Sequence, residues 1–228
     1  MGTRFQDPLR AAVERDDAVA ITLLVQAGCT VDAGIMSSIL KHATSTGNTS
    51  LLQAVVDGGF DLNTNFSGHL GDSLILAITY KHHLSVALLL GYGCDPNLNR
   101  RAESDTPLEL AAKVALPSIV ELLLQHGAQT HNRSALHYAA MNDRTDIAEV
   151  LVRHGQDINV IPDNEDIPAG YIERGWGTAL HEAVRAQKLS FTKWLLDHGA
   201  QTSIKDNKGM TAREVAIGMA DEEILNIL

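Results

Sequence analysis

The residues in this sequence that could do chemistry are ten histidines, two cysteines and scattered acidic residues. His82 and His83 are adjacent, and adjacent residues on a helix point in different directions, which disfavours a shared metal ion. Two cysteines cannot build a zinc site of the CxxC type. The sequence also has no G-x-S-x-G nucleophile elbow, no phosphate-binding P-loop and no dinucleotide-binding glycine pattern. We therefore predict no catalytic residue, no cofactor and no bound metal.

The composition is that of a globular protein. Of 228 residues, 45% are apolar and 20% are charged, which is unlike a disordered chain. The net charge is −10, and Lys and Arg do not cluster, so a nucleic-acid partner is not expected. No apolar run is long enough to cross a bilayer, and residues 1–10 lack signal-peptide features. We expect a cytoplasmic protein, with nuclear entry left open, and no membrane partner.

The sequence contains a repeat with residues at fixed spacing. A leucine recurs at Leu9, Leu40, Leu74, Leu108, Leu136 and Leu180. Three residues after each stands an alanine, at Ala12, Ala43, Ala77, Ala111, Ala139 and Ala183. Nineteen residues after each stands a glycine, at Gly28, Gly59, Gly93, Gly127, Gly155 and Gly199. A seventh unit starts at Arg213 with Ala216.

Each repeated block predicts a pair of helices. The leucine and alanine are i, i+3 neighbours on one helical face. Apolar pairs such as Leu123-Leu124 come before each glycine and complete an amphipathic second helix. The glycine suits a helix end, where a positive φ is needed. A single pair cannot close a core, because both of its flat sides stay exposed until neighbouring pairs cover them.

The repeats resemble a known family. The segments "DTPLELAAKVALPSIVELLLQHGAQ" from Asp105, "SALHYAAMNDRTDIAEVLVRHGQDIN" from Ser134 and "GTALHEAVRAQKLSFTKWLLDHGAQT" from Gly177 are similar to ankyrin repeats. The resemblance implies an all-α repeat solenoid of about seven helix-turn-helix units with hairpin loops, in which the first and last repeats are atypical. It also implies that His137 and His181, at matching positions of successive repeats, make structural hydrogen bonds.

The resemblance further implies a single ankyrin-repeat domain over residues 1–228. We place its repeats at approximately 5–33, 36–64, 70–98, 104–131, 132–159, 176–204 and 207–228, with a long hairpin insertion over 160–176.

The insertion is the largest variation in the array. From each glycine to the next leucine, or to Arg213, the intervals are 12, 15, 15, 9, 25 and 14 residues. Length that varies only between blocks indicates surface loops. In the longest interval, "YIERGW" is interpreted as a returning strand. The insertion is either an ordinary surface loop or a contact finger, since Tyr171, Arg174 and Trp176 are residue types enriched at binding hot spots.

In ankyrin arrays, the hairpin tips and the inward side of the first helices form a concave strip that binds proteins. By position, the resemblance assigns these residues to the strip, with Thr79 and Met210 beside them: Tyr80, Glu103, Asp105, Lys113, His131, Arg133, Met141, Asn142, Arg174 and Arg185. Tyr171 and Trp176 of the finger are added for their residue types, which makes twelve candidate partner-binding residues. The mix of polar, aromatic and oppositely charged residues suits one particular protein or peptide.

We therefore expect a non-catalytic protein–protein interaction module whose partner the sequence does not identify. An alternative is a small-molecule or catalytic site in a cleft between the finger and repeats five and six. Seven residues could converge there: His131, Arg133, Asn142, Tyr171, Arg174, Glu182 and Arg185. Acid–base chemistry would require several of them within hydrogen-bond reach of one substrate. A third possibility is a recognition subunit whose catalytic chain is separate.

Overall fold

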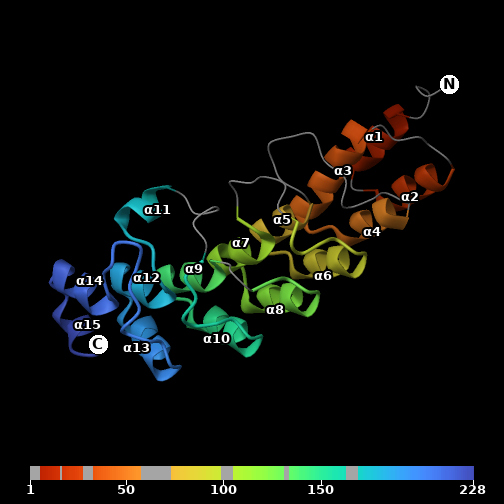
Figure 1. Ribbon diagram of the computed structural model, residues 1–228. Coiled ribbons are helices and arrows are strands. Elements are labelled where there is room, and N and C mark those ends of the chain that lie inside the picture. Colours follow the sequence, from red (N-terminus) through yellow and green to blue (C-terminus); the bar gives the residue numbers. More distant parts are fainter. Residues whose placement is uncertain are drawn as a thin grey trace. The chain divides into compact units, whose positions relative to one another are not determined.

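The computed structural model describes residues 6–15, 17–27, 33–57, 73–98, 105–130, 134–162 and 169–228. It divides into two compact units, Met1–Pro96 and Asn97–Leu228. Their helices are labelled in Figure 1. Throughout the described residues the secondary structure is helical, apart from one isolated bridge between Lys205 and Thr211. The predicted all-α repeat architecture is confirmed, while the single domain over 1–228 stays a prediction.

The N-terminal unit is a stack of helix pairs. Its helices are α1 Gln6–Glu14, α2 Ala18–Gln26, α3 Ala33–Thr46, α4 Thr49–Asp57, α5 Ser73–Thr79 and α6 His83–Gly91. The first helices α3 and α5 pack side by side, and the second helices α2, α4 and α6 pack on one another in sequence. Consecutive pairs therefore cover each other's flat sides, as the repeat requires.

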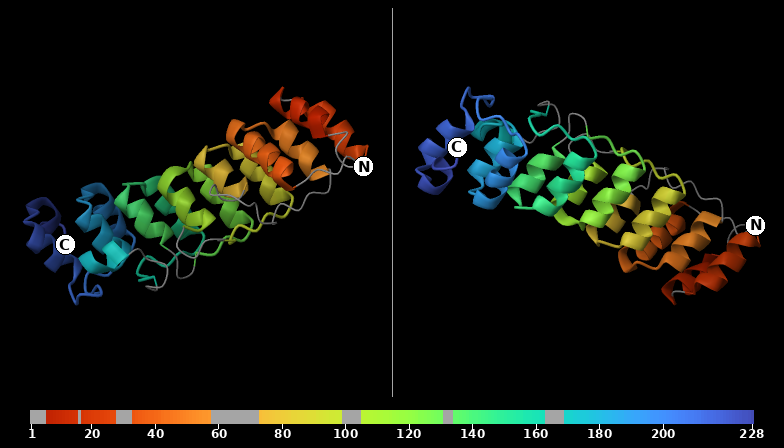
Figure 2. Two further views of the ribbon diagram at one scale, coloured as in Figure 1. Left: turned by 90° about the horizontal axis from the view of Figure 1, so that it is seen from above. Right: turned by 90° about the horizontal axis from the view of Figure 1, so that it is seen from below.

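The C-terminal unit repeats this arrangement. Its helices are α7 Pro107–Val114, α8 Pro117–Gln125, α9 Ala135–Met141, α10 Thr145–Arg153, α11 Ala169–Arg174, α12 Ala179–Arg185, α13 Leu189–Asp197, α14 Ala212–Met219 and α15 Glu222–Leu225. The first helices α7, α9, α12 and α14 pack in sequence, each with its own second helix (Figure 2). Because α9 packs directly on α12, the long interval between them does not interrupt the stack.

The repeated leucines and alanines form the core. The six leucines are at most 2% exposed, and the seven alanines at most 1%. The seventh unit differs, because Arg213 occupies the leucine position and is exposed. Replacing one of these leucines with alanine would leave a cavity in a close-packed interior. The repeated leucine and alanine positions thus form the buried core of each unit.

The repeated glycines end the second helices. Gly93, Gly127, Gly155 and Gly199 have φ between +85° and +88°, a region that glycine adopts without steric cost. At Gly127, the following N–H of Ala128 donates to the Leu123 carbonyl at 2.9 Å, which completes a helix-ending turn. The predicted positive φ is confirmed at these four positions. Gly28 and Gly59 lie outside the described residues.

The end of the insertion is helical, so the predicted returning strand is wrong. Ala169–Arg174 forms α11, and Gly175 follows it with φ +102°. A Cβ on Gly175 would lie 2.6 Å from Arg185 Nη2 and 2.7 Å from Asp206 Oδ2. Glycine therefore allows the chain to end the helix and pass close to these side chains. In Figure 1, α11 lies beside α12 on the side away from α13.

Candidate binding surface

Two buried histidines connect the first helices to the loops that follow them. His181 accepts from the Thr178 N–H through Nδ1 at 3.1 Å, and its Nε2 donates to the Met210 carbonyl at 3.1 Å. His137 Nε2 donates to the Gly177 carbonyl at 2.9 Å. Both rings are 0% exposed. The predicted structural role of these histidines is confirmed, because each bonds its helix to the start of the next repeat.

Trp176 is a core residue, which corrects its prediction as an exposed contact residue. Its side chain is 0% exposed. The indole stacks on the His137 ring with centroids 4.9 Å apart, and the Tyr171 ring meets it edge-on at 5.7 Å. Its backbone N–H donates to Asn207 Oδ1 at 2.7 Å. Trp176 thus joins two neighbouring repeats and the loop before α14, so a repeat core does require it.

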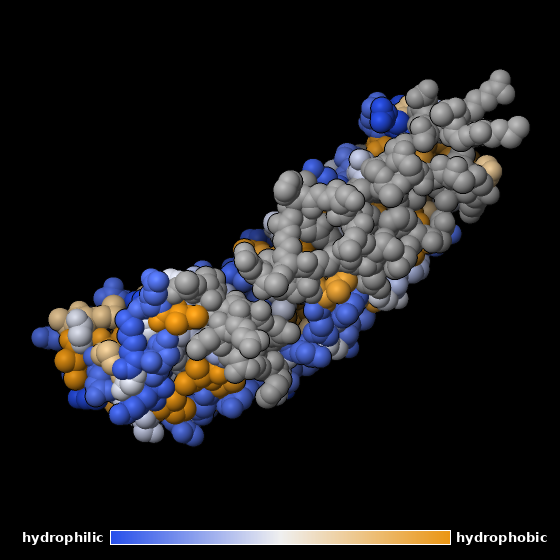
Figure 3. All heavy atoms as spheres, turned by 45° about the horizontal axis from the view of Figure 1, so that its top comes forward, coloured by the Kyte–Doolittle hydropathy of each residue, from blue (hydrophilic) through white to orange (hydrophobic). Residues whose placement is uncertain are grey.

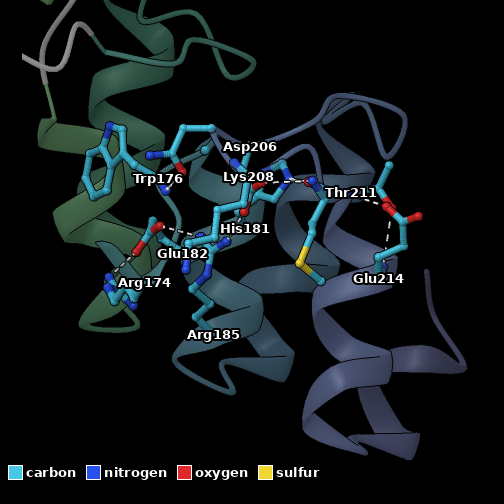
Figure 4. A network of polar contacts seen from close by, with 12 residues as sticks. Arg174, Trp176, His181, Glu182, Arg185, Asp206, Lys208, Thr211 and Glu214 are labelled. Carbon is cyan, nitrogen blue, oxygen red and sulfur yellow. Dashed lines mark hydrogen bonds and ion pairs between the residues drawn. The ribbon is translucent and has the colours of Figure 1, made fainter. Parts of the chain in front are cut away.

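Around α12, two guanidinium groups pair with one buried carboxylate. Glu182 is 0% exposed and pairs with Arg174 of α11 and with Arg185, the latter at 2.9 Å. Arg185 also pairs with Asp206 in the loop before α14 (Figure 4). Burial raises the pKa of the Glu182 carboxyl, and the two guanidinium groups offset only part of that rise. The insertion, the sixth repeat and the following loop therefore share one ionic network.

A second charged group lies on α7 and α9. Lys113 Nζ is 2.7 Å from both Asp105 carboxylate oxygens. The same ammonium lies 3.7 Å from the centroid of the Tyr138 ring, a cation–π contact. Burial raises the pKa of the Tyr138 hydroxyl, and the Asp105 carboxylate raises it further. The phenol therefore stays protonated beside the ion pair.

Comparison with protein families identifies the repeat. A model described as ankyrin repeats (3 copies) matches residues 74–161, and one described as ankyrin repeats (many copies) matches residues 136–196. Together the matched ranges cover more than half of the chain. The chain is an ankyrin repeat protein.

Proteins from several organisms are similar to this chain. Putative ankyrin repeat protein FPV031 of Fowlpox virus (strain NVSL) is 31% identical over 170 residues, which cover 69% of this chain and 47% of that protein. Alpha-latroinsectotoxin-Lt1a of Latrodectus tredecimguttatus is 39% identical over 31% of this chain and 5% of the toxin. Potassium channel AKT2/3 of Arabidopsis thaliana is 24% identical over 86% of this chain and 23% of the channel. The chain thus spans less than half the length of each of these relatives.

The ankyrin structure brings together only some of the predicted strip residues. Asp105 pairs with Lys113, and Arg174 lies over the Tyr171 ring, 4.7 Å from its centroid, while also sharing Glu182 with Arg185. The remaining positions are scattered or undescribed, namely Tyr80, Met141, Asn142, Glu103, His131 and Arg133. Of these, Glu103, His131 and Arg133 lie outside the described residues.

The other three positions have simple local environments. Tyr80 belongs to the N-terminal unit, is 52% exposed and stacks on His82 with ring centroids 6.2 Å apart. Met141 is half-buried on α9, and the exposed Asn142 donates from Nδ2 to the Tyr138 carbonyl at 2.7 Å. Asn142 thus closes its own helix end, while Tyr80 presents an unburied aromatic ring.

Three residues of these networks were missed from the predicted strip: Tyr138, Asp206 and Glu182, the last of which was predicted only for the alternative cleft. Tyr138 and Asp206 are both buried polar residues, at 4% and 6% exposure. Tyr138 stands two positions after the repeated leucine, as Glu182 does, and this shared place marks the inward side of a first helix. Asp206 opens the turn before Thr211 and accepts from the N–H groups of Lys208 and Met210, each at 2.9 Å. Position in the repeat was the available signal for Tyr138.

The described part of the ankyrin array has no helix long and apolar enough to cross a membrane. Within the same residues, no group of three or more His, Cys, Asp or Glu side chains is arranged to hold a metal ion.

His137 is expected to make the C-terminal unit sensitive to mild acid. Burial lowers the pKa of His137 from 6.5 to about 4, and its Nδ1 has no hydrogen-bond partner. As the pH falls below 6.5, the unfolded state therefore takes up the proton first, and stability is lost down to about pH 4. When the pH is lowered from about 7.5 to about 5, this residue alone should lower the unfolding free energy by about 2 kcal/mol.

Urea denaturation at the two pH values measures this loss. His137→Gln should lose about 2 kcal/mol less than wild type over the same interval, because the carboxylates common to both proteins contribute equally. An identical pH dependence of the two proteins would show that His137 stays accessible to protons in the folded state.

Proposed function

We propose that this ankyrin repeat protein is a non-catalytic module that binds a protein partner through the first-helix side of its array and the 160–176 insertion. Ankyrin repeats are generally protein–protein interaction modules. The observation that carries the proposal is a run of charged and aromatic side chains along α7, α9, α11 and α12, with Lys113 on Tyr138 at one end and Arg185 on Glu182 at the other. Such mixed surfaces favour specificity for one partner.

The surface of the C-terminal unit supports a polar partner rather than a large apolar one. In Figure 3, hydrophilic side chains divide its apolar surface into small patches on the face drawn. Extended exposed apolar patches mark hydrophobic interfaces, whereas mixed surfaces use anchors and charge pairs. A cytoplasmic location and the absence of a nucleic-acid partner stay predictions that agree with this proposal.

The alternative of a catalytic or small-molecule cleft has weaker support. Glu182 is the carboxylate among the predicted cleft residues, and it is buried and paired with two guanidinium groups. An acid–base group needs access to its substrate. Asn142 is occupied by the Tyr138 carbonyl. We therefore favour the binding module.

A charge swap tests the proposed surface without removing the ion pair. Asp105→Lys/Lys113→Asp keeps one acid beside one base but reverses the polarity that a partner meets. In affinity purification followed by mass spectrometry, we expect this variant to recover at least about tenfold less of the partner that wild type recovers, since misplaced like charges cost several kcal/mol. Lys193→Glu, at an exposed position of α13, is the control and should recover the same partner as wild type. Equal recovery by the charge-swap variant and wild type would reject the proposed surface.

A further inference from the structure

Helix α11 covers a part of the first-helix side that is only half-buried in four other repeats. The residue two positions after the repeated leucine is half-buried in four repeats, at Ala11, His42, Leu76 and Leu110. At Tyr138, Glu182 and Val215 it is 4%, 0% and 8% exposed, and of these three Glu182 pairs with Arg174 of α11. Helix α11 brings Arg174 onto Glu182 and Tyr171 onto the edge of Trp176, so it covers this part of the first-helix side in the sixth repeat.

Side-chain contacts hold α11 in place. Tyr171 packs on Trp176, Arg174 pairs with Glu182, and the Ile172 carbonyl accepts from Asn207 Nδ2 at 3.1 Å. The helix has only six residues, and so short a helix is not stable alone in water. Its conformation therefore depends on these contacts with the array.

The contacts are of the type that a bound peptide would make. An aromatic side chain lies on the Trp176 ring, and one helical turn later a guanidinium meets a fully buried carboxylate. Tyr171 and Arg174 are i, i+3 neighbours, so both point from one face of the helix. Glu173 between them is exposed and makes none of these contacts. Arginine and aromatic residues are also the usual anchors of protein interfaces.

We propose that α11 is a built-in occupant of the surface formed by Trp176 and Glu182, and that a protein partner displaces it with a helical segment carrying an aromatic residue and an arginine three positions later. This inference rests on the proposed function, because it specifies which partner chemistry the array accepts. The attached helix competes with the partner at the effective concentration set by its short connection, which is on the order of millimolar. To displace α11, a partner must bind this surface more strongly than Tyr171 and Arg174 bind it at that effective concentration.

A peptide added in trans tests whether the surface accepts this chemistry. The probe is a fluorescently labelled peptide with the sequence of residues 169–175, AGYIERG. The full chain with Tyr171→Ala/Arg174→Ala should bind it by fluorescence anisotropy at least about tenfold more tightly than wild type, whose own α11 occupies the site. Glu173→Ala is the matched control on the same helix and should bind the peptide as weakly as wild type. A probe with glutamate in place of its arginine should bind none of the three proteins.

Two results would overturn the inference. One is equal binding of the peptide to wild type and to the double variant. The other is no binding to the folded double variant up to about 1 mM, the concentration that the natural connection provides. Circular dichroism and urea denaturation establish that the double variant is folded. The assay needs no cellular partner, so it can succeed while the partner purification fails, or the reverse.

Discussion

Trp176→Ala is expected to lower the unfolding free energy of the C-terminal unit by about 3–5 kcal/mol, as for other buried aromatic residues. The indole is 0% exposed, stacks on His137 and meets the Tyr171 ring edge-on. Neither ring can move in to fill the space without breaking contacts of its own, including the bond from His137 to the Gly177 carbonyl. The loss should be measured by urea denaturation followed by circular dichroism.

The other tryptophan of the chain supplies the control. Trp194 on α13 is only half-buried and contacts Phe191 and His198 of its own repeat. Trp194→Ala should therefore cost clearly less than Trp176→Ala, because less apolar surface returns to water. Comparable losses in the two variants would mean that Trp176 does not join neighbouring repeats in the way described.

The repeated helix pairs could be predicted because their residues recur at fixed offsets. Leu108, Ala111 and Gly127 each have a counterpart in other repeats, and each role depends on local geometry: two buried positions on one helix face and one positive φ. Spacing therefore carries the necessary information. The same reasoning placed His137 and His181 in structural roles, which their hydrogen bonds confirm.

The insertion could not be predicted in this way, because it has no counterpart in other repeats. Helix α11 spans fewer than two turns, too short for a periodic pattern to distinguish it from a strand. The burial of Trp176 depends on His137, which belongs to the preceding repeat, and on Asn207 in the loop before α14. Contacts between residues so far apart in sequence follow from packing rather than from local preference. Hot-spot residue types therefore suggested exposure where the structure has burial.

The ion pairs of the strip could not be predicted either, because most of them too depend on contacts between residues from different helices or loops. Position in the repeat placed Asp105, Lys113, Arg174 and Arg185 near the first-helix side, but it did not give their partners. Each of the four belongs to an ion pair within the array. A partner must therefore bind these groups as they are already paired, or replace one member of a pair. If a partner displaces α11, it replaces Arg174 as the ion-pair partner of Glu182.

The buried carboxylate of this network should be its most sensitive point. Glu182→Gln is expected to cost about 3 kcal/mol of unfolding free energy, because removing one member of a buried ion pair leaves an incompletely compensated charge. Arg185 is that charge: its side chain is 9% exposed, and it would retain only Asp206. Arg174 is 36% exposed and can turn toward water. The loss should therefore come mainly from Arg185.

Arg174→Gln separates these two contributions. It removes a partly exposed pair while Glu182 keeps Arg185, so it should cost about 1 kcal/mol or less. Urea denaturation of both variants at one pH gives the comparison. If Arg174→Gln proved as destabilising as Glu182→Gln, the carboxylate would depend on α11 rather than on Arg185, and a partner could not displace α11 without unfolding the sixth repeat. A small effect of Arg174→Gln beside a large effect of Glu182→Gln is the result that displacement of α11 requires, since the array must stay folded once Arg174 has left.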